Sequence, residues 1–320
     1  MKSIMLFTVA VLVAVVVPNG LAQKYPTKPM RLISPFAPGG GTDILSRLLA
    51  VPLSETFGQP VVVDNRPGAG GATGAELVAR AEPDGYTLIT VSSSYAATSA
   101  YGKPPYDPIS GIQPIISLGT TGLVLTVHPS VPVKSAKELF DHAKANPGKL
   151  NYSTVGPGSI THLSHELLKL QAGINIVHIP YKGGGPALTA LVAGEVQITM
   201  ISILPTIPHI KAGRLRAIGL TSPKRSSVLP DLPTINETLP GFEVVHWYGI
   251  WGPKGMPKDV VARWNGEVAK VLHGVDMSSK LRSEGLEGGG GPPQQFGELL
   301  RRDIEKWRKV VIESKIKRES

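Results

Sequence analysis

The chain of 320 residues contains no cysteine. This absence excludes a disulfide framework, a thiolate metal site and a lipid anchor on an N-terminal cysteine. The fold is therefore expected to depend on its own hydrophobic core.

Long hydrophobic runs are also lacking, apart from a run of 14 residues at positions 4–17 that is apolar except for Thr8. A bilayer core of about 30 Å needs about 20 such residues, so this run is too short to span it. Lys2 precedes the run, and Gly20 and Ala22 follow it at the spacing of a signal-peptide cleavage site. We expect residues 1–22 to be a signal peptide cleaved after Ala22, which predicts a soluble periplasmic protein. An uncleaved anchor is the alternative.

Acidic residues are fewer than basic ones, 24 against 33, for a net charge of +9. Loss of Lys2 with the signal peptide leaves +8, and a basic surface favours anionic partners. Basic residues cluster only at positions 301–309, where apolar residues at helical spacing predict an amphipathic helix with a solvated face. Nucleic acid is therefore not expected as a partner.

Short β-branched segments alternate with glycine-rich turns and helical patterns, which is typical of parallel α/β architecture. One unit of strand, glycine-rich loop and helix recurs over residues 30–57, 61–81, 150–172 and 176–193. The 298 residues left after the signal peptide, 320 minus 22, fit two domains. We therefore expect two similar lobes, joined by strands near residues 123–127 and 243–250.

The glycine-rich loops are the main functional signal. A loop between a strand and a helix presents unpaired backbone N–H groups, and the helix start adds about half a positive charge. Glycine lets a ligand approach this backbone closely. Four such loops, two in each lobe, predict one small anion held from both sides. The alternative for each loop is that its glycines only make a tight turn.

Nucleotide-binding motifs are absent. Gly102-Lys103 and Gly148-Lys149 are followed by proline and leucine instead of serine or threonine, so neither is a Walker loop. The glycine-rich segment 68–74 follows a strand, but Thr73 occupies the place of the third glycine of a dinucleotide fingerprint.

Residues for hydrolysis or metal binding form no known motif. His162, His165 and Glu166 match neither order of the zinc protease helices, and a Gly-x-Ser-x-Gly elbow is missing. We expect one histidine to face the cleft and the other solvent, and Asp43 to be a helix N-cap. An exported hydrolase using Asp43, Ser159 and His162 is the alternative from another functional class. We expect no catalytic residue, metal or cofactor.

Several longer motifs occur in a fixed order along the chain. They include residues 35–43 (PFAPGGGTD), 61–71 (VVVDNRPGAGG), 147–153 (PGKLNYS), 177–186 (VHIPYKGGGP) and 208–216 (PHIKAGRLR). With them the chain resembles the tripartite tricarboxylate transporter receptors, the Bug family of extracytoplasmic solute receptors. The resemblance is collinear over residues 25–316.

The resemblance implies an α/β, two-lobed, type II-like periplasmic-binding-protein fold with a ligand cleft between the lobes. Residues 23–122 and 246–320 would form lobe 1, and residues 123–245 would form lobe 2. The implied function is capture of a small organic carboxylate, by a monomer, for the permease subunits of a membrane transporter. A sensor that presents its ligand to a signalling partner is the alternative.

The resemblance also implies which residues hold the ligand carboxylate. Backbone amides and hydroxyls of the first loop in each lobe, and of the loops after Val91 and Met200, would do so. The expected contacts are Phe36, Gly39, Gly40, Thr42, Asp43, Ser93, Ser94, Gly158, Ser159, His162 and Ser202.

Two positions depart from the family pattern. Ala72 stands where relatives often have asparagine, and Ile201 stands where they often have aspartate or another polar residue. An acid at position 201 could pair with the amine of an amino-acid ligand. With Ile201 we expect amino acids to be disfavoured and the ligand to carry a neutral or apolar body, such as an aromatic ring, behind its carboxylate.

Overall fold

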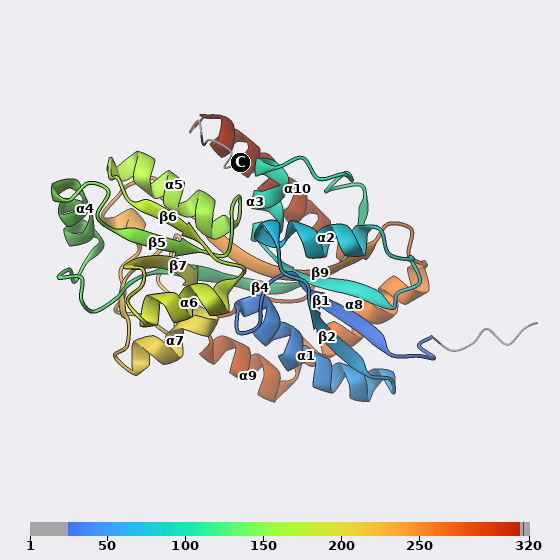
Figure 1. The fold of residues 1–320 in the computed structure, drawn as a ribbon. Helices are drawn as coiled ribbons and strands as arrows, with labels where there is room; N and C mark the ends of the chain where they lie inside the picture. The colour runs from blue at the N-terminus through green and yellow to red at the C-terminus, as the bar shows by residue number, and fades with distance from the viewer. Residues whose placement is uncertain (1–24, 314–315, 317–320) are drawn as a thin grey trace, which may run out of the picture.

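The computed structural model describes residues 25–313 and 316. The expected signal peptide, residues 1–22, and its cleavage after Ala22 lie outside the described residues. The described part is a mixed α/β structure in which helices flank a nine-stranded sheet (Figure 1). None of the helices in this part is long and apolar enough to cross a membrane.

The strands form two groups that share one long strand. Sheet A has the order β2-β1-β3-β9-β4. In sheet B, β4 pairs with both β8 and β7, β7 pairs with β5, and β5 pairs with β6. The first three strands are parallel to one another, as are β5, β6 and β7, whereas β4 and β9 run antiparallel to their neighbours. The bounds are β1 (Met30–Ser34), β2 (Val61–Asn65), β3 (Thr87–Ser92), β4 (Ile112–Val127), β5 (Asn151–Thr154), β6 (Val177–Pro180), β7 (Ile198–Ser202), β8 (Arg216–Leu220) and β9 (Val245–Pro253).

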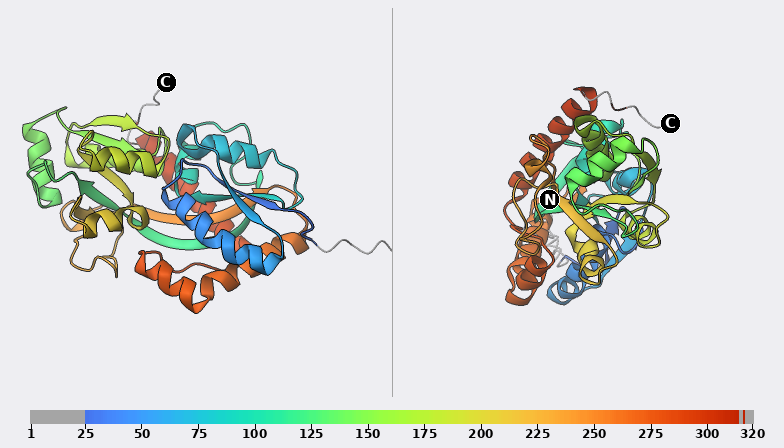
Figure 2. Two further views of the ribbon diagram at one scale, coloured as in Figure 1. Left: turned by 60° about the horizontal axis from the view of Figure 1, so that its bottom comes forward. Right: turned by 90° about the vertical axis from the view of Figure 1, so that its left-hand side faces the viewer.

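Strand β4 connects the two sheets. Its residues 112–122 pair with β9 in sheet A, and its residues 123–127 pair with β7 and β8 in sheet B. Figure 2 shows β4 and β9 as long curved strands that run between the two halves of the molecule. The sequence predicted a strand only over residues 123–127, because Pro114 and Gly119 weaken the strand pattern in the first part of β4. The pairing of β4 with β9 shifts register beside both residues.

The helices follow the strands in the predicted alternation. The four predicted strand–loop–helix units are present as β1–α1, β2–α2, β5–α5 and β6–α6. The bounds are α1 (Gly41–Phe57), α2 (Ala72–Ala79), α3 (Ser94–Tyr101), α4 (Ala136–Ala145), α5 (Ile160–Ala172), α6 (Gly184–Val192), α7 (Ile203–Lys211), α8 (Lys258–His273), α9 (Val275–Ser283) and α10 (Pro293–Glu313).

Two helices that the sequence analysis assigned to loops begin directly after β3 and β7. Helix α3 is rich in serine, alanine and tyrosine and lacks charged residues, and α7 contains Pro205 and Pro208. Proline is tolerated in the first turn of a helix but costs a hydrogen bond further in. Tertiary packing stabilises both helices, since Tyr95, Ala96, Ile203 and Leu204 are buried.

The C-terminal helix α10 is amphipathic, as predicted. It buries Phe296, Ile304 and Trp307, whereas Arg301 and Lys306 are exposed. It packs against α3 and β4, far from it in sequence (Figure 1). The basic residues near the C-terminus are thus the solvated face of a helix that covers sheet A.

Candidate functional site

A small cavity lies where strands of both sheets end. Its volume is about 30 Å³. That is room for about two water molecules. The lining residues are Phe36, Gly40, Gly41, Thr42, Ser92, Ser94, Leu123, Val155, Ile160, Thr161, Gly184, Ile201, Ser202, His246 and Tyr248.

Five helices begin at this cavity. Gly41 belongs to the first turn of α1, Ser94 to that of α3, Thr161 to that of α5 and Gly184 to that of α6, and Ser202 directly precedes α7. The N–H groups of a first turn have no partner within the helix, and each N-terminus carries about half a positive charge. The cavity is therefore surrounded by backbone donors and partial positive charge, which favours an anion.

Charged side chains take no part in this lining. The lining residues include no Lys, Arg, Asp or Glu. An anion in this cavity would be held by backbone N–H groups, hydroxyls and helix dipoles. Hydrogen bonds to a charged group are roughly twice as strong as those between neutral groups.

Polar contacts within the cavity join the two sheets. The Tyr248 hydroxyl on β9 donates to Ser202 Oγ at the end of β7, at 2.7 Å. The Ile160 N–H at the start of α5 donates to Ser94 Oγ at the start of α3, at 3.3 Å. Both bonds therefore connect the half of the molecule built on sheet A to the half built on sheet B.

His246 supplies a neutral polar group. It lies two residues before Tyr248 on β9, so both side chains occupy the same face of the strand. Its Nδ1 lies 2.6 Å from Ser93 Oγ, and its ring packs edge-on against Tyr248. Burial lowers the pKa of His246 to about 3, which keeps the imidazole uncharged at neutral pH.

The remaining wall is apolar. Phe36, Leu123, Val155, Ile160 and Ile201 present carbon atoms to the cavity, and all are buried. Ile201, which the sequence analysis identified as a departure from the family pattern, thus lies on the cavity wall. A ligand atom beside it would contact hydrocarbon.

Facing loops close the cavity from outside. The Ala37 N–H after β1 donates to the Lys182 carbonyl after β6, at 3.0 Å. A Cβ at Gly40 would lie 3.3 Å from the Gly184 nitrogen, so these two glycines touch through their backbones. A Cβ at Gly41 would overlap the Tyr248 hydroxyl. Glycine at these positions lets the two sides approach each other.

The expected ligand contacts fall into two groups. Five of them line the cavity: Phe36, Gly40, Thr42, Ser94 and Ser202. The other six are Gly39, Asp43, Ser93, Gly158, Ser159 and His162, which are not among the lining residues. They support the surrounding loops, and their direct contact with a ligand stays a prediction.

Asp43 holds the loop before α1. The prediction that it is the N-cap is wrong, because Gly40 is the N-cap and Asp43 lies within the first turn. Its carboxylate accepts from the Gly39 N–H at 3.0 Å, from Arg47 Nε at 3.0 Å and from Asn65 Nδ2 at 2.9 Å. Burial opposes its ionisation, but these hydrogen bonds outweigh burial and lower the pKa of Asp43.

Ser159 and His162 shape the turn before α5. Ser159 caps the helix by accepting from the His162 N–H, and its hydroxyl donates to the Gly156 carbonyl at 2.6 Å. The Gly158 N–H donates to His162 Nδ1 at 3.1 Å. The Ser159 hydroxyl therefore points at a carbonyl, and Asp43 lies on another helix with other partners. These contacts give Asp43 and Ser159 roles in holding their own loops.

The two histidines of α5 are both buried, so the expectation that one faces solvent is wrong. His162 stacks on His178 with ring centroids 4.3 Å apart, and His165 stacks on Tyr152 at the same distance. Burial lowers the pKa of His165 to about 3. Within residues 25–313 and 316, no three His, Asp or Glu side chains form a group that could hold a metal ion.

The expected ligand contacts omit several lining residues, among them Gly41 and Thr161, which lie within the expected first loops at 36–43 and 155–162, and Gly184, His246 and Tyr248. The first three lie in or beside motifs already recognised as glycine-rich loops. The alternation of His246 and Tyr248 along a strand was a usable signal for a shared face. Their proximity to the helix N-termini could not be predicted from it.

The fold and the cavity together define a periplasmic binding protein, a class in which a cleft between two α/β halves encloses a small solute. The structure superposes on the periplasmic binding protein BugD with a TM-score of 0.88 at 32% identity, covering 92% of this chain and 100% of that one. The predicted fold class is confirmed.

The family follows from the sequence comparison. Residues 45–316 match the model of the tripartite tricarboxylate transporter family receptor, so the chain belongs to that family, as the motifs predicted. Two similar structures come from Rhodopseudomonas palustris. Rpa4515 with adipate has a TM-score of 0.88 at 38% identity, covering 91% of this chain and 99% of that one. MatC with bound malate has a TM-score of 0.85 at 31% identity, covering 90% and 100%.

Proposed function

We propose that this protein is a periplasmic receptor that binds a small organic carboxylate and presents it to the permease subunits of a tripartite transporter. The observation that carries the proposal is the convergence of five helix N-termini on one small cavity that no charged side chain lines. Such a cavity fits an anion whose charged group is small, such as a carboxylate. Family members in complex with adipate and with malate support the same ligand class.

The energetics agree with capture at low concentration. A micromolar Kd requires about −8 kcal/mol. Charge-assisted hydrogen bonds contribute roughly 1.5–3 kcal/mol each, so three to five of them match this affinity after the cost of ordering the ligand. Backbone donors at helix starts are already fixed in place, which keeps that cost low.

We infer that closure is a hinge motion of two lobes, residues 23–122 with 246–320 and residues 123–245. The support is the change of partners along β4, which pairs within sheet A up to Gly122 and within sheet B from Leu123 onward. Bending at this point and at the start of β9 would open the cavity. Ligand contacts from both lobes would then make closure conditional on binding.

Calorimetry with ligand-free protein tests the proposal. The protein is unfolded in guanidinium, dialysed and refolded to remove any co-purified ligand, and then titrated with adipate, malate and their uncharged diamides. We expect at least one acid to bind with a micromolar Kd and its diamide to bind at least 100-fold more weakly. Failure of a panel of aliphatic and aromatic acids to bind below 1 mM would overturn the proposal.

Delivery to a permease needs a separate assay. Uptake of the radiolabelled acid into proteoliposomes that contain the permease subunits should require added receptor. A ligand that binds tightly but is never transported would instead support the alternative function, a sensor for a signalling partner. Light scattering during size-exclusion chromatography tests the expected monomer.

A further inference from the structure

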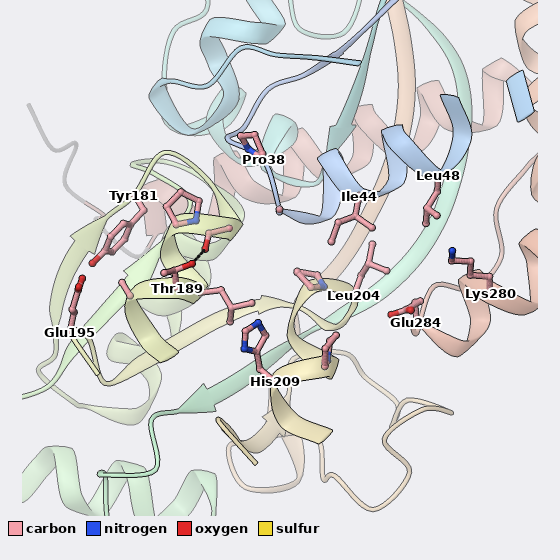
Figure 3. A pocket seen from close by; sticks show the side chains of 17 residues that line it. Pro38, Ile44, Leu48, Tyr181, Thr189, Glu195, Leu204, His209, Lys280 and Glu284 are labelled. Atoms are coloured by element: carbon pink, nitrogen blue, oxygen red, sulfur yellow. Dashed lines mark hydrogen bonds between the residues drawn. The ribbon is translucent and has the colours of Figure 1, made fainter. Parts of the chain in front are cut away.

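A larger hollow lies directly outside the closed cavity. This outer groove has a volume of about 770 Å³, and its walls come from α1, α6, α7 and α9 (Figure 3). Small-molecule sites commonly occupy about 300–1,000 Å³. The groove therefore has the size of a ligand site, although the inner cavity holds only about 30 Å³.

Apolar side chains of α1 and α7 face each other within the groove, with His209 and Thr189 nearby, and charged side chains lie at its ends. Ile44 and Leu48 of α1 point toward Leu204 of α7 across the groove, whereas Lys280 and Glu284 lie at one end (Figure 3). Leu204 packs in the same hydrophobic cluster as α1 residues. The groove thus offers hydrocarbon from both sides of the cleft.

Only a thin wall separates the groove from the cavity. Gly39 lines the groove and Gly40 lines the cavity, and the same division occurs at Gly185 and Gly184. The wall consists of the backbone of these glycines, with the Gly40 and Gly184 backbones in contact and no side chain between them. A small separation of the two loops would join the two spaces.

We propose that the outer groove takes the apolar tail of the ligand whose carboxylate lies among the helix N-termini. The ligand would be a carboxylic acid with an extended alkyl or aryl tail. This inference rests on the proposed function, because the inner cavity must hold the acid group. The apolar side chains of Ile201 and Val155 lie beside the Gly184 wall, since a Cβ added at Gly184 would lie 3.8 Å from Ile201 Cγ2 and 4.0 Å from Val155 Cγ1.

A series of straight-chain monocarboxylates tests the inference. Ligand-free protein is titrated with propionate, butyrate, hexanoate and octanoate, and with 3-phenylpropionate. Burial of each added methylene is expected to tighten Kd two- to fourfold, about fourfold being the full burial limit. The wild-type Kd should therefore fall steadily with chain length.

Blocking the groove should flatten this dependence. Thr189 is exposed on α6 and lines the groove, so Thr189→Trp fills it without entering the core. Val51→Trp is the matched control, because Val51 is exposed on α1 and does not line the groove. We expect Thr189→Trp to reduce the gain in affinity from propionate to octanoate at least tenfold. Val51→Trp should show the same gain in affinity as the wild type.

The outcomes separate this inference from the proposed function. Short acids that bind without any gain from a longer chain would overturn the tail site and leave the receptor function standing, as expected if the groove only docks another protein. A gain that persists in Thr189→Trp would also overturn the tail site. Failure of every acid to bind would overturn both proposals.

Discussion

The Tyr248 hydroxyl donates a hydrogen bond to Ser202 Oγ at 2.7 Å, and this bond joins sheet A to sheet B inside the cavity. Tyr248 pairs with Ser92 in sheet A, whereas Ser202 ends a strand of sheet B. Burial raises the pKa of Tyr248 well above its usual value, so the phenol keeps its proton. The bond is thus a neutral contact that stabilises the closed arrangement.

Removing this bond should weaken ligand binding. We expect Tyr248→Phe to cost about 1 kcal/mol of closure, or about fivefold in Kd for the bound acid, measured by calorimetry. Tyr95→Phe is the matched control, because the Tyr95 hydroxyl donates to the Pro108 carbonyl at 2.8 Å within one lobe. The control should lower the melting temperature and keep Kd. An equal effect of both variants on Kd would contradict this role.

A side chain at Gly41 should prevent closure. The Cβ of Gly41→Ala would overlap the Tyr248 hydroxyl, so we expect at least a tenfold loss of affinity with little change in the melting temperature of the unliganded protein. Gly266→Ala in α8 is the control, since its Cβ would meet no atom within 4 Å. That change should stabilise the fold by about 0.5–1 kcal/mol because alanine favours a helix interior. Unaltered binding by Gly41→Ala would show that the cavity tolerates a wider opening.

Buried His246 should make stability depend on pH. Burial lowers its pKa to about 3, so below pH 6.5 the unfolded chain binds a proton that the folded chain does not. Stability should then fall as the pH drops from 6.5 toward 3. The contribution from His246 between pH 7 and pH 5 is about 2 kcal/mol, measurable by urea unfolding.

The variant His246→Gln isolates this contribution. Its loss of stability between pH 7 and pH 5 should be about 2 kcal/mol smaller than that of the wild type. Part of the dependence should persist, because burial lowers the pKa of His165 to about 3 as well. His273→Gln, at an exposed position of α8, serves as the control. A variant with the wild-type pH dependence would mean that His246 is protonated in the fold.

Ile201 should select against amino acids. An ammonium group beside this buried side chain would lose its hydration without gaining a partner, since no acidic residue lines the cavity. We expect 3-phenylpropionate to bind at least tenfold more tightly than phenylalanine in competition calorimetry. A preference for the amino acid would contradict the assignment of an apolar wall.

Local patterns predicted those parts of the fold that local chemistry decides. The units β1–α1 and β5–α5 follow from apolar strands, glycine-rich turns and helical periodicity, all visible within about 30 residues. Helix α7 was missed because Pro205 and Pro208 oppose a helix locally, and packing of Ile203 and Leu204 outweighs that cost. The start of β4 was missed because Pro114 and Gly119 weaken its strand pattern, and only the irregular pairing with β9 accommodates them.

The sequence by itself determined the α/β class, the family and the glycine-rich turns between strands and helices, because each depends on short motifs and their order. Only the tertiary structure decided that five helices begin around one cavity, and that Tyr248 and His246 complete it. His246 and its partner Ser93 are 153 residues apart. Sequence periodicity cannot predict a contact between residues so far apart, because the contact forms only where β3 and β9 pair and the two sheets meet.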